Sequence, residues 1–275
     1  MDYSTQTKLS PTVLTIAGSD PSGGAGIQAD LKTMTAIGVY GAAAITCITV
    51  QNSLGVTESA PLDGSLVVRQ VQAVLADHHV THIKIGMIGT IEIARALGEL
   101  LAGYQGEVIY DPVLASTTGH SLLNCSSLTE LSDQLISKVT VLTPNCDELE
   151  QLCRQKIVTP EEALACARSI LDRHVRLQAV IVKGGHLEAD SPDIHDYLAL
   201  KNQEVITSKR TRIKSVNLHG TGCTYASAFT AFHCLENDYR KAFSLSAAYM
   251  DKVISKSRSI SLVKSGVNGP LVHAR

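Results

Sequence analysis

Four polar or glycine-rich segments of this 275-residue chain hold the side chains best suited to chemistry. They are Ala17–Gly26, Val50–Ser53, Leu142–Glu148 and Asn217–Thr224. All four fall at the ends of predicted strands, or between a strand and a helix. In an open α/β sheet, ligands bind beyond the carboxyl ends of the strands. The sequence therefore predicts that these segments meet in one site.

The first segment is rich in glycine and leads into a predicted helix that contains Asp30. Glycine allows a positive φ and lets the backbone approach a ligand closely, which makes Gly18 a candidate. The order of residues fits neither the dinucleotide fingerprint nor the P-loop, because it is not G-x-G-x-x-G and no Lys-Ser/Thr follows. Asp30 lies a turn or two into the helix, where its carboxylate could reach a substrate hydroxyl. A strand–helix turn with a solvated Asp is the equally simple alternative.

The second segment places Gln51 just after a buried strand. The Gln side chain offers one acceptor and two donor hydrogens, which match a heteroaromatic edge that carries a ring nitrogen and an amine. An ordinary polar turn explains the residue equally well when it is taken alone.

The third segment contains Asn145 and, three residues later, Glu148. This spacing is typical of a helix cap with an acid in the first turn. Together with Asp111, at the end of its own strand, the pair could also hold Mg²⁺ through water, because Mg²⁺ prefers oxygen ligands and retains waters. The two roles are compatible.

The fourth segment opens a helix with Gly220, Thr221, Gly222 and Cys223. Amides at a helix N-terminus, together with the helix dipole, form an anion site. A Cys in that first turn is expected to have a lowered pKa and to accept a proton near neutral pH. The alternative is a glycine turn beside a small buried Cys. Lys183, before two glycines at another strand end, could steady phosphates.

Short apolar runs alternate with helical patterns along the whole chain. Strands are predicted at 12–17, 42–49, 82–85, 107–111, 139–142 and 179–183, with a hairpin of 194–200 and 204–208. Helices are predicted at 24–37, 63–78, 91–101, 127–138, 148–153, 160–174, 222–236 and 239–257. This alternation indicates βαβ units. We expect a single α/β domain with a mostly parallel central sheet and helices on both faces.

Composition excludes several classes of protein. The net charge is −2, and there are no Trp and only three Phe, so neither a basic face nor stacking platforms for nucleic acid are expected. The seven Cys lack any CxxC pair, which favours reduced thiols in a cytoplasmic protein. No signal peptide or apolar stretch long enough to cross a membrane is expected.

Seven motifs in series resemble one enzyme family. They are AGSDPSGGAGIQADLKT, VQN, KIGM, DPV, TPNCDE, VKGGH and HGTGC. In this order, and over roughly residues 13–249, they closely resemble the hydroxymethylpyrimidine/phosphomethylpyrimidine kinases of thiamine biosynthesis, which have the ribokinase-like fold. The resemblance implies ATP- and Mg²⁺-dependent phosphorylation of 4-amino-5-hydroxymethyl-2-methylpyrimidine and then of its monophosphate. It also suggests a homodimer.

The resemblance also implies roles for individual residues. Gly18, Ala25, Asp30, Gln51 and Met87 would line the pyrimidine pocket. Asp111, Asn145 and Glu148 would serve Mg²⁺ and the phosphates, and Lys183 would lie by the nucleotide. Gly220, Thr221 and Gly222 would form the anion hole, with Cys223 as the base. Residues 1–11 are expected to form an unmatched extension, and 12–275 the kinase domain.

Two other functions remain open at this point. A pyridoxal or pyridoxine kinase of the same fold would share most of these residues, although Gln51-Asn52 looks more like the pyrimidine enzymes. A non-catalytic ligand sensor is the other, but such a protein needs neither an anion hole nor a base.

Overall fold

A nine-stranded sheet, in the order β3-β2-β1-β4-β5-β6-β7-β8-β9, forms the centre of the described part of the chain. The structure is a computed structural model that describes residues 10–113, 134–186 and 191–273. The strands are β1 (Thr12–Ser19), β2 (Tyr40–Asn52), β3 (Gly55–Pro61), β4 (Val80–Ile85), β5 (Glu107–Tyr110), β6 (Val141–Leu142), β7 (Ala179–Val182), β8 (Asp193–Leu200) and β9 (Val205–Thr211). The run from β2 to β7 is parallel, and β3, β8 and β9 pair antiparallel at the two edges.

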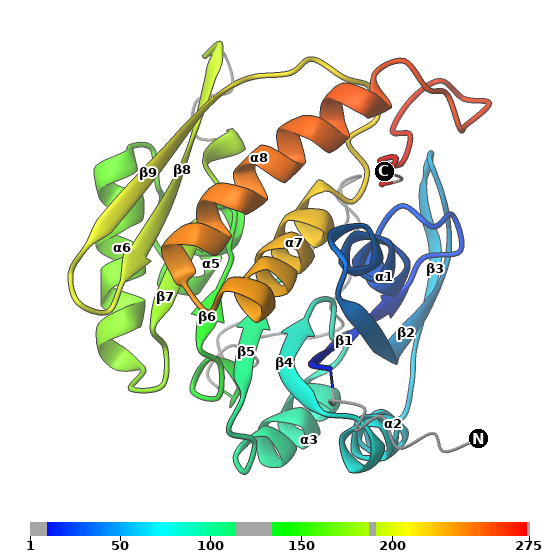
Figure 1. The fold of residues 1–275 in the computed structure, drawn as a ribbon, viewed down its shortest axis with the longest axis vertical. Helices are drawn as coiled ribbons and strands as arrows, with labels where there is room; N and C mark the ends of the chain where they lie inside the picture. Colours follow the sequence, from blue (N-terminus) through cyan, green and yellow to red (C-terminus); the bar gives the residue numbers. More distant parts are fainter. Residues whose placement is uncertain (1–9, 114–133, 187–190, 274–275) are drawn as a thin grey trace, which may run out of the picture.

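Helices cover both faces of the sheet (Figure 1). α1 (Gly26–Ile37), α7 (Thr221–Glu236) and α8 (Tyr239–Ser257) pack together on one face. The other face carries α2 (Gly64–Asp77), α3 (Ile91–Leu101), α5 (Cys146–Cys153) and α6 (Pro160–Arg173). A short 3-10 turn, η1 (Gly184–His186), follows β7.

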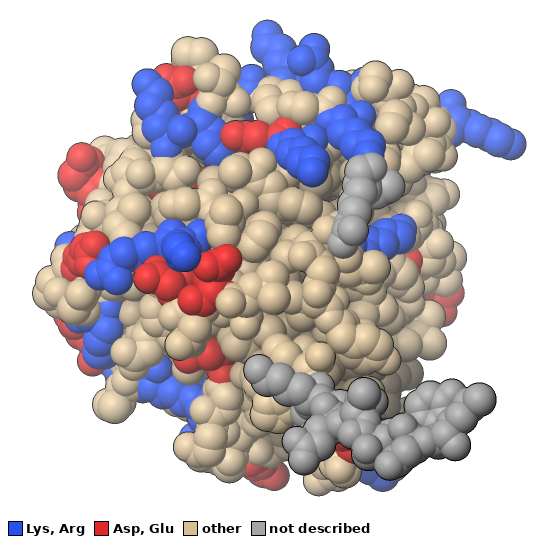
Figure 2. All heavy atoms as spheres, viewed as in Figure 1, with Lys and Arg blue, Asp and Glu red and all other residues tan. Residues whose placement is uncertain are grey.

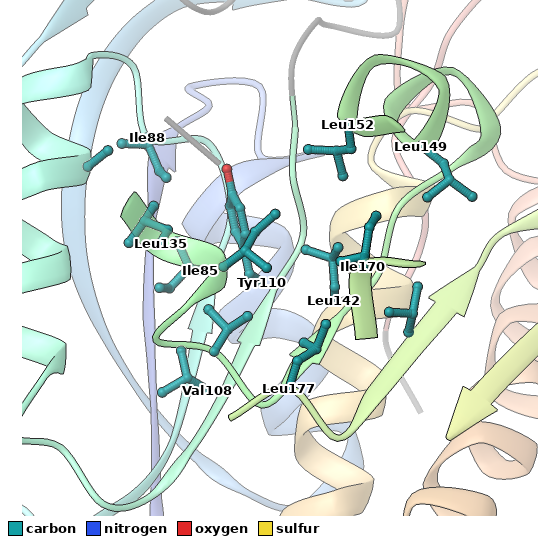
Figure 3. Close-up of a cluster of buried hydrophobic side chains, with 14 of the residues drawn as sticks. Ile85, Ile88, Val108, Tyr110, Leu135, Leu142, Leu149, Leu152, Ile170 and Leu177 are labelled. Atoms are coloured by element: carbon teal, nitrogen blue, oxygen red, sulfur yellow. The ribbon is translucent and has the colours of Figure 1, made fainter. Parts of the chain in front are cut away.

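Alternation of apolar side chains along the strands explains the two layers of helices. Val108 and Tyr110 of β5 pack in the core under α3, α5 and α6, whereas Ile109 between them packs in the core under α7 and α8. Successive strand residues point to opposite faces, so a strand that is apolar at every position must be covered on both sides. Figure 3 shows part of the first of these cores, which includes Tyr110 and Leu142 from the strands and Leu149 of α5.

The predicted α/β domain is confirmed, and most predicted elements lie within a few residues of their observed ends. The helices predicted at 91–101 and 239–257 have the predicted bounds. β3 was not predicted, because only Val56 of this edge strand is buried and its apolar alternation is weak. Most of the helix predicted at 127–138 and of the extension predicted at 1–11 lies outside the described residues.

The surface carries charges of both signs. On the face viewed in Figure 2, Lys and Arg lie mainly along the upper rim and elsewhere alternate with Asp and Glu, and most of the viewed area is uncharged. None of the helices in the described ranges is long and apolar enough to cross a membrane.

Candidate functional site

A cavity of about 840 Å³ lies at the carboxyl ends of the parallel strands. Twelve of the thirteen predicted site residues line it: Gly18, Ala25, Gln51, Met87, Asp111, Asn145, Glu148, Lys183, Gly220, Thr221, Gly222 and Cys223. The predicted strand ends therefore do converge on one site, although they come from positions spread over about 200 residues of the chain.

One end of the cavity is formed by Gly18, Ala25, Gln51 and Met87. A methyl group on Gly18 would lie 3.0 Å from Met87 Sδ, so glycine lets this side chain close over the end of β1. The Thr46 hydroxyl donates a hydrogen bond of 2.6 Å to the Met87 carbonyl and holds that segment in place. Gly18, Ala25 and Met87 thus form an apolar part of the cavity wall, which Gln51 also lines.

Asp20 organises the glycine-rich loop at this end. Its carboxylate accepts hydrogen bonds from the amides of Ser22 (2.8 Å), Gly24 (3.1 Å) and Ala25 (2.8 Å). It also lies 2.8 Å from His219 Nε2. Burial raises the pKa of Asp20, but the hydrogen bonds from His219 and Ser22 outweigh burial, so the pKa is lowered overall. The loop is thus built around a buried, ionised carboxylate.

The N-terminus of α7 joins this end of the cavity to the other. Gly220 is the N-cap and has a φ of +83°, and a methyl group there would lie 1.8 Å from the Gly24 carbonyl oxygen. A methyl group on Gly222 would lie 3.6 Å from Lys183 Nζ and 3.7 Å from Asp111 Oδ2. The first turn of α7 therefore lies between the glycine-rich loop and the Lys183–Asp111 pair.

The other end of the cavity contains a cluster of charged side chains. Lys183 Nζ lies 2.7 Å from Asp111 Oδ1 and 3.8 Å from Glu148 Oε2. Burial lowers the pKa of Lys183, but the charges of Asp111 and Glu148 and the hydrogen bond to Asp111 together outweigh burial, so the pKa is raised. Burial, assisted by Asp111, raises the pKa of Glu148 to about 7 against the opposing charge of Lys183. The two acids thus share one cation, and Glu148 is the more weakly compensated.

The expected helix cap is present at the same place. Asn145 Oδ1 accepts a hydrogen bond of 2.8 Å from the Glu148 amide, and Glu148 Oε2 accepts one of 2.7 Å from the Asn145 amide. These two bonds form a capping box at the start of α5. Because Glu148 is tied down through one oxygen, its orientation toward the cavity is fixed by the helix cap.

The oxygen atoms at this end fit a magnesium ion. Asp111 Oδ2 is buried and has no hydrogen-bond partner within the described residues, although Oδ1 of the same carboxylate bonds both Lys183 and Thr143. The described residues contain no group of three or more His, Cys, Asp or Glu that could hold a metal. Mg²⁺ is commonly held by one or two carboxylates together with waters and phosphates, so the pair Asp111 and Glu148 fits such an ion.

Cys223 differs from its prediction in one respect. It lines the cavity in the first turn of α7, as predicted. However, burial raises the pKa of its thiol to about 11, although the Lys84 ammonium and a hydrogen bond from the Gly26 amide act in the opposite direction. The predicted lowering of this pKa is wrong, because desolvation of the thiolate outweighs the helix N-terminus.

Asp30 is the one predicted site residue that does not line the cavity. Its side chain is fully buried and accepts hydrogen bonds from Thr15 Oγ1 (2.6 Å), Ser227 Oγ (2.6 Å) and Lys84 Nζ (3.0 Å). The predicted contact of Asp30 with a substrate hydroxyl is therefore not available. One turn into α1, the carboxylate faces the sheet and α7 instead of the cavity.

His219 and Arg210 are among the site residues that the sequence did not predict. His219 immediately precedes the predicted anion hole and lines the cavity. Arg210 also lines it and pairs with Asp196 (2.6 Å) and Asp251 (2.9 Å). His219 was signalled by its place beside Gly220. Arg210 lies in an alternating hairpin strand, where nothing distinguishes it from a solvated charge.

Comparisons with known proteins agree with this geometry. A family model described as phosphomethylpyrimidine kinase matches residues 20–269. The chain is 35% identical to the hydroxymethylpyrimidine/phosphomethylpyrimidine kinase of Rhizobium meliloti over 96% of this chain and 97% of that protein. It is also 35% identical to the enzyme of the same name from Escherichia coli, over 94% and 96%.

Among solved structures, both a pyridoxal kinase and a phosphomethylpyrimidine kinase are similar to this chain. The pyridoxal kinase of Staphylococcus aureus in complex with ADP superposes with a TM-score of 0.84 at 30% identity, covering 97% of this chain and 94% of that one. A phosphomethylpyrimidine kinase from Clostridium difficile gives 0.74 at 35% identity, covering 90% and 100%.

Proposed function

Because the chain belongs to the phosphomethylpyrimidine kinase family, we propose that its cavity holds an aminopyrimidine beside Gln51 and ATP beside Lys183. The reaction is transfer of the γ-phosphoryl group of ATP to the hydroxymethyl group of 4-amino-5-hydroxymethyl-2-methylpyrimidine. A second transfer to the monophosphate gives the diphosphate used in thiamine biosynthesis. The relatives are named for both steps.

The single observation that carries this proposal is the position of the α7 N-terminus. Its first-turn glycines contact the glycine-rich loop on one side and approach Lys183 and Asp111 on the other. A phosphoryl group that passes from the nucleotide end of the cavity to the pyrimidine end would meet the backbone amides of this turn. Phosphoryl transfer depends mainly on positioning and on stabilisation of charge, which this arrangement supplies.

At the nucleotide end, Lys183 is placed to bind phosphate oxygens. Its ammonium is held by Asp111 and Glu148, so its charge is kept and its direction is fixed. Asp111 and Glu148 are the carboxylates that would hold Mg²⁺, with Asn145 beside them. When bound, the ion neutralises charge on the phosphates. Support for a nucleotide comes from the S. aureus pyridoxal kinase, which was solved with ADP and with AMP-PCP.

At the pyrimidine end, Cys223 is placed to accept the proton of the attacking hydroxyl. The thiol must first lose its own proton, and Lys84 and Lys183 are the nearby cations that favour the thiolate. The hydroxyl oxygen then attacks the γ-phosphorus of ATP, the bond from that phosphorus to the β–γ bridging oxygen breaks so that ADP leaves, and the hydroxyl proton passes to sulfur. Removal of the proton by a positioned base commonly contributes about 10²–10⁴ in rate.

A coupled ADP-release assay tests the function directly. Hydroxymethylpyrimidine, its monophosphate, pyridoxal and ribose are offered separately and then in competition. We expect turnover with both pyrimidines, and none with ribose. ATP hydrolysis that does not depend on the pyrimidine, or binding of the pyrimidine without turnover, would contradict the proposal and would favour a ligand sensor.

Pyridoxal phosphorylation is the second candidate function. The observation in its favour is the TM-score of 0.84 with the pyridoxal kinase, above the 0.74 of the phosphomethylpyrimidine kinase. Gln51 separates the two, because its amide can pair with both the ring nitrogen and the amine of the aminopyrimidine but not with the equivalent edge of pyridoxal. In the Gln51→Met variant, kcat/KM should fall about 5- to 150-fold for the pyrimidine and less for pyridoxal.

We further propose that the protein is a cytoplasmic homodimer. The six cysteines that the structure describes form no disulfide, as expected in a reducing compartment. Light scattering coupled to gel filtration distinguishes a dimer from the 29.3 kDa monomer. Cell fractionation tests the location.

A further inference from the structure

His219, Asp20 and Gln51 form a junction at the pyrimidine end of the cavity. His219 Nε2 lies 2.8 Å from Asp20 Oδ2 and 3.0 Å from Gln51 Nε2. All three residues line the cavity, and the side chains of His219 and Asp20 are only 8% and 4% exposed. A single imidazole nitrogen therefore faces both the Asp20 carboxylate and the Gln51 amide, which the proposed function assigns to binding of the substrate.

The protons at this junction restrict the Gln51 amide. The Asp20 carboxylate accepts three backbone N–H bonds and is ionised, so the ring nitrogen beside it must carry a hydrogen. A nitrogen that carries a hydrogen cannot accept one from an amide NH₂ group. The carbonyl end of the Gln51 amide, which a half-turn exchanges with the NH₂ end, is the end that suits this position.

Thr49 favours the same orientation from the other side. Its hydroxyl lies 3.0 Å from the Ser19 carbonyl and 3.3 Å from Gln51 Oε1. The hydroxyl has one hydrogen, and the carbonyl at the shorter distance takes it. The Thr49 oxygen is then left as an acceptor, which suits the NH₂ end of Gln51. Both neighbours thus select an amide with its carbonyl toward His219 and its NH₂ toward Thr49.

We propose that His219 is a specificity-determining positioning residue: its Nε2 hydrogen bonds Asp20, so Nε2 cannot accept a hydrogen from the NH₂ end of Gln51, and this exclusion fixes the direction of the Gln51 amide. The site then offers an acceptor on the His219 side and a donor on the Thr49 side. An aminopyrimidine must bind with its amine toward the first and its ring nitrogen toward the second. This inference rests on the proposed function, because that function assigns the ring edge to Gln51.

The side chain of His219 can be changed without dismantling the loop around it. The backbone of His219 donates a hydrogen bond to the Gly269 carbonyl (3.2 Å), which a substitution leaves in place. Asp20 keeps its three amide donors, and Gln28 Oε1 still accepts from the Asp20 amide (2.9 Å). Loss of the imidazole is therefore expected to free the orientation of the Gln51 amide while leaving the glycine-rich loop largely in place.

The first test compares kcat/KM for the aminopyrimidine and for pyridoxal in matched variants. In His219→Met the ratio of the two should fall about tenfold, within the range expected for an unpaired polar group. In His219→Gln an amide nitrogen can replace Nε2, and the ratio should recover to within about threefold of the wild type. Asp20→Asn, which removes the charge that orients the hydrogen, should lower the ratio as His219→Met does.

Gln28→Met provides the control for a loosened loop. It removes a side chain that accepts a hydrogen bond from the Asp20 amide and donates one to the Ser19 hydroxyl, and neither bond involves Gln51. The thermal midpoint should fall while the ratio of kcat/KM values stays at the wild-type value. A similar fall of the ratio in this variant would overturn the inference, because loop mobility alone would then explain the effect.

A double-mutant cycle with Gln51→Met tests whether His219 acts through Gln51. In the Gln51→Met background, His219→Met should produce no further change in the ratio. Independent, additive effects would overturn the proposal. Calorimetry of aminopyrimidine binding to the wild type distinguishes a failure of the proposed function from a failure of the role of His219. Absence of binding rejects the proposed function. Binding together with an unchanged ratio of kcat/KM values in His219→Met rejects only the role of His219.

Discussion

Ser227 Oγ donates a hydrogen bond of 2.6 Å to Asp30 Oδ1 and ties α7 to α1. Ser227 lies four residues after Cys223, and Asp30 lies four residues after Gly26, whose amide bonds the Cys223 thiol. Residues four apart share one face of a helix, so the first turns of the two helices lie in register. The carboxylate of Asp30, paired with Lys84, is therefore located one turn below the proposed base.

This buried ion pair should dominate the stability of the region. Lys84 Nζ lies 3.0 Å from Asp30 Oδ2 and both side chains are fully buried. Lys84→Met leaves an uncompensated carboxylate, which should lower the free energy of unfolding by about 3–5 kcal/mol. Thr15→Val removes a neutral donor to the same carboxylate and should cost less, about 2 kcal/mol. Urea denaturation measures both, and equal losses would contradict the assignment.

Replacing the thiol of Cys223 should affect turnover more than binding. In Cys223→Ala, kcat for the hydroxymethyl substrate is expected to fall about 10²–10⁴-fold, because proton removal loses its base. The KM for the pyrimidine should change little. Cys234→Ala, in the last turn of α7 and away from the cavity, is the control and should keep wild-type turnover. Near-wild-type turnover of Cys223→Ala would remove the assignment.

The fold could be predicted from local patterns, whereas part of the site depends on distant partners. Apolar periodicity located the parallel strands, and the spacing of Asn145 and Glu148 predicted the capping box that the structure shows. Asp30 was placed incorrectly because its partner Lys84 lies 54 residues away. The one sequence signal for this pairing is that Lys84 is a charged residue within the otherwise apolar strand His82–Ile85. Periodicity cannot show which face of a helix a second helix covers.

The electrostatics of the site were even less accessible from the sequence. The anion site at the start of α7 was visible as a glycine motif, but the pKa of Cys223 depends on how completely the thiol is desolvated. The pairing of His219 with Asp20 joins residues 199 positions apart. Neither the burial nor the pairing is encoded in the neighbouring residues, so both required the tertiary structure.

Glu148→Gln should weaken the use of magnesium. The variant removes the charge of a buried acid beside Asp111, while the amide oxygen can still accept from the Asn145 backbone and preserve the cap. The Mg²⁺ concentration for half-maximal activity should rise about 10–100-fold. Glu161→Gln makes the same change of charge at an exposed position that does not line the cavity and should shift this concentration far less. If Mg²⁺ titrations of the two variants coincide, Glu148 has only its capping role.

A buried histidine pair should make the fold sensitive to acid. His82 Nε2 lies 2.9 Å from His233 Nδ1, and burial lowers the pKa of His82 from 6.5 to about 4. The unfolded chain therefore binds more protons than the folded protein between these values. Stability should be complete above pH 6.5 and fall as the pH drops toward 4, by about 3 kcal/mol for this group. Urea denaturation at pH 5 and 7.5 should show a smaller difference in His82→Gln than in the wild type, and an equal difference would contradict this.

The position of Gly220 allows steric contact to be separated from backbone strain. Gly220 has a φ of +83° and a methyl group there would lie 1.8 Å from the Gly24 oxygen, whereas Gly266 has a φ of +68° with nothing within 4 Å. Alanine at either position carries the cost of a left-handed backbone, about 1–2 kcal/mol. Only Gly220→Ala must also push the glycine-rich loop away from the α7 amides.

A displacement of about 1 Å can cost about 10²-fold in rate, so kcat should fall at least that far in Gly220→Ala. In Gly266→Ala it should stay within about threefold of the wild type, although both variants lose stability. Steady-state kinetics and urea denaturation of the two proteins decide the matter, since a matching loss of kcat in both would show that strain, and not the contact with Gly24, accounts for the need for glycine.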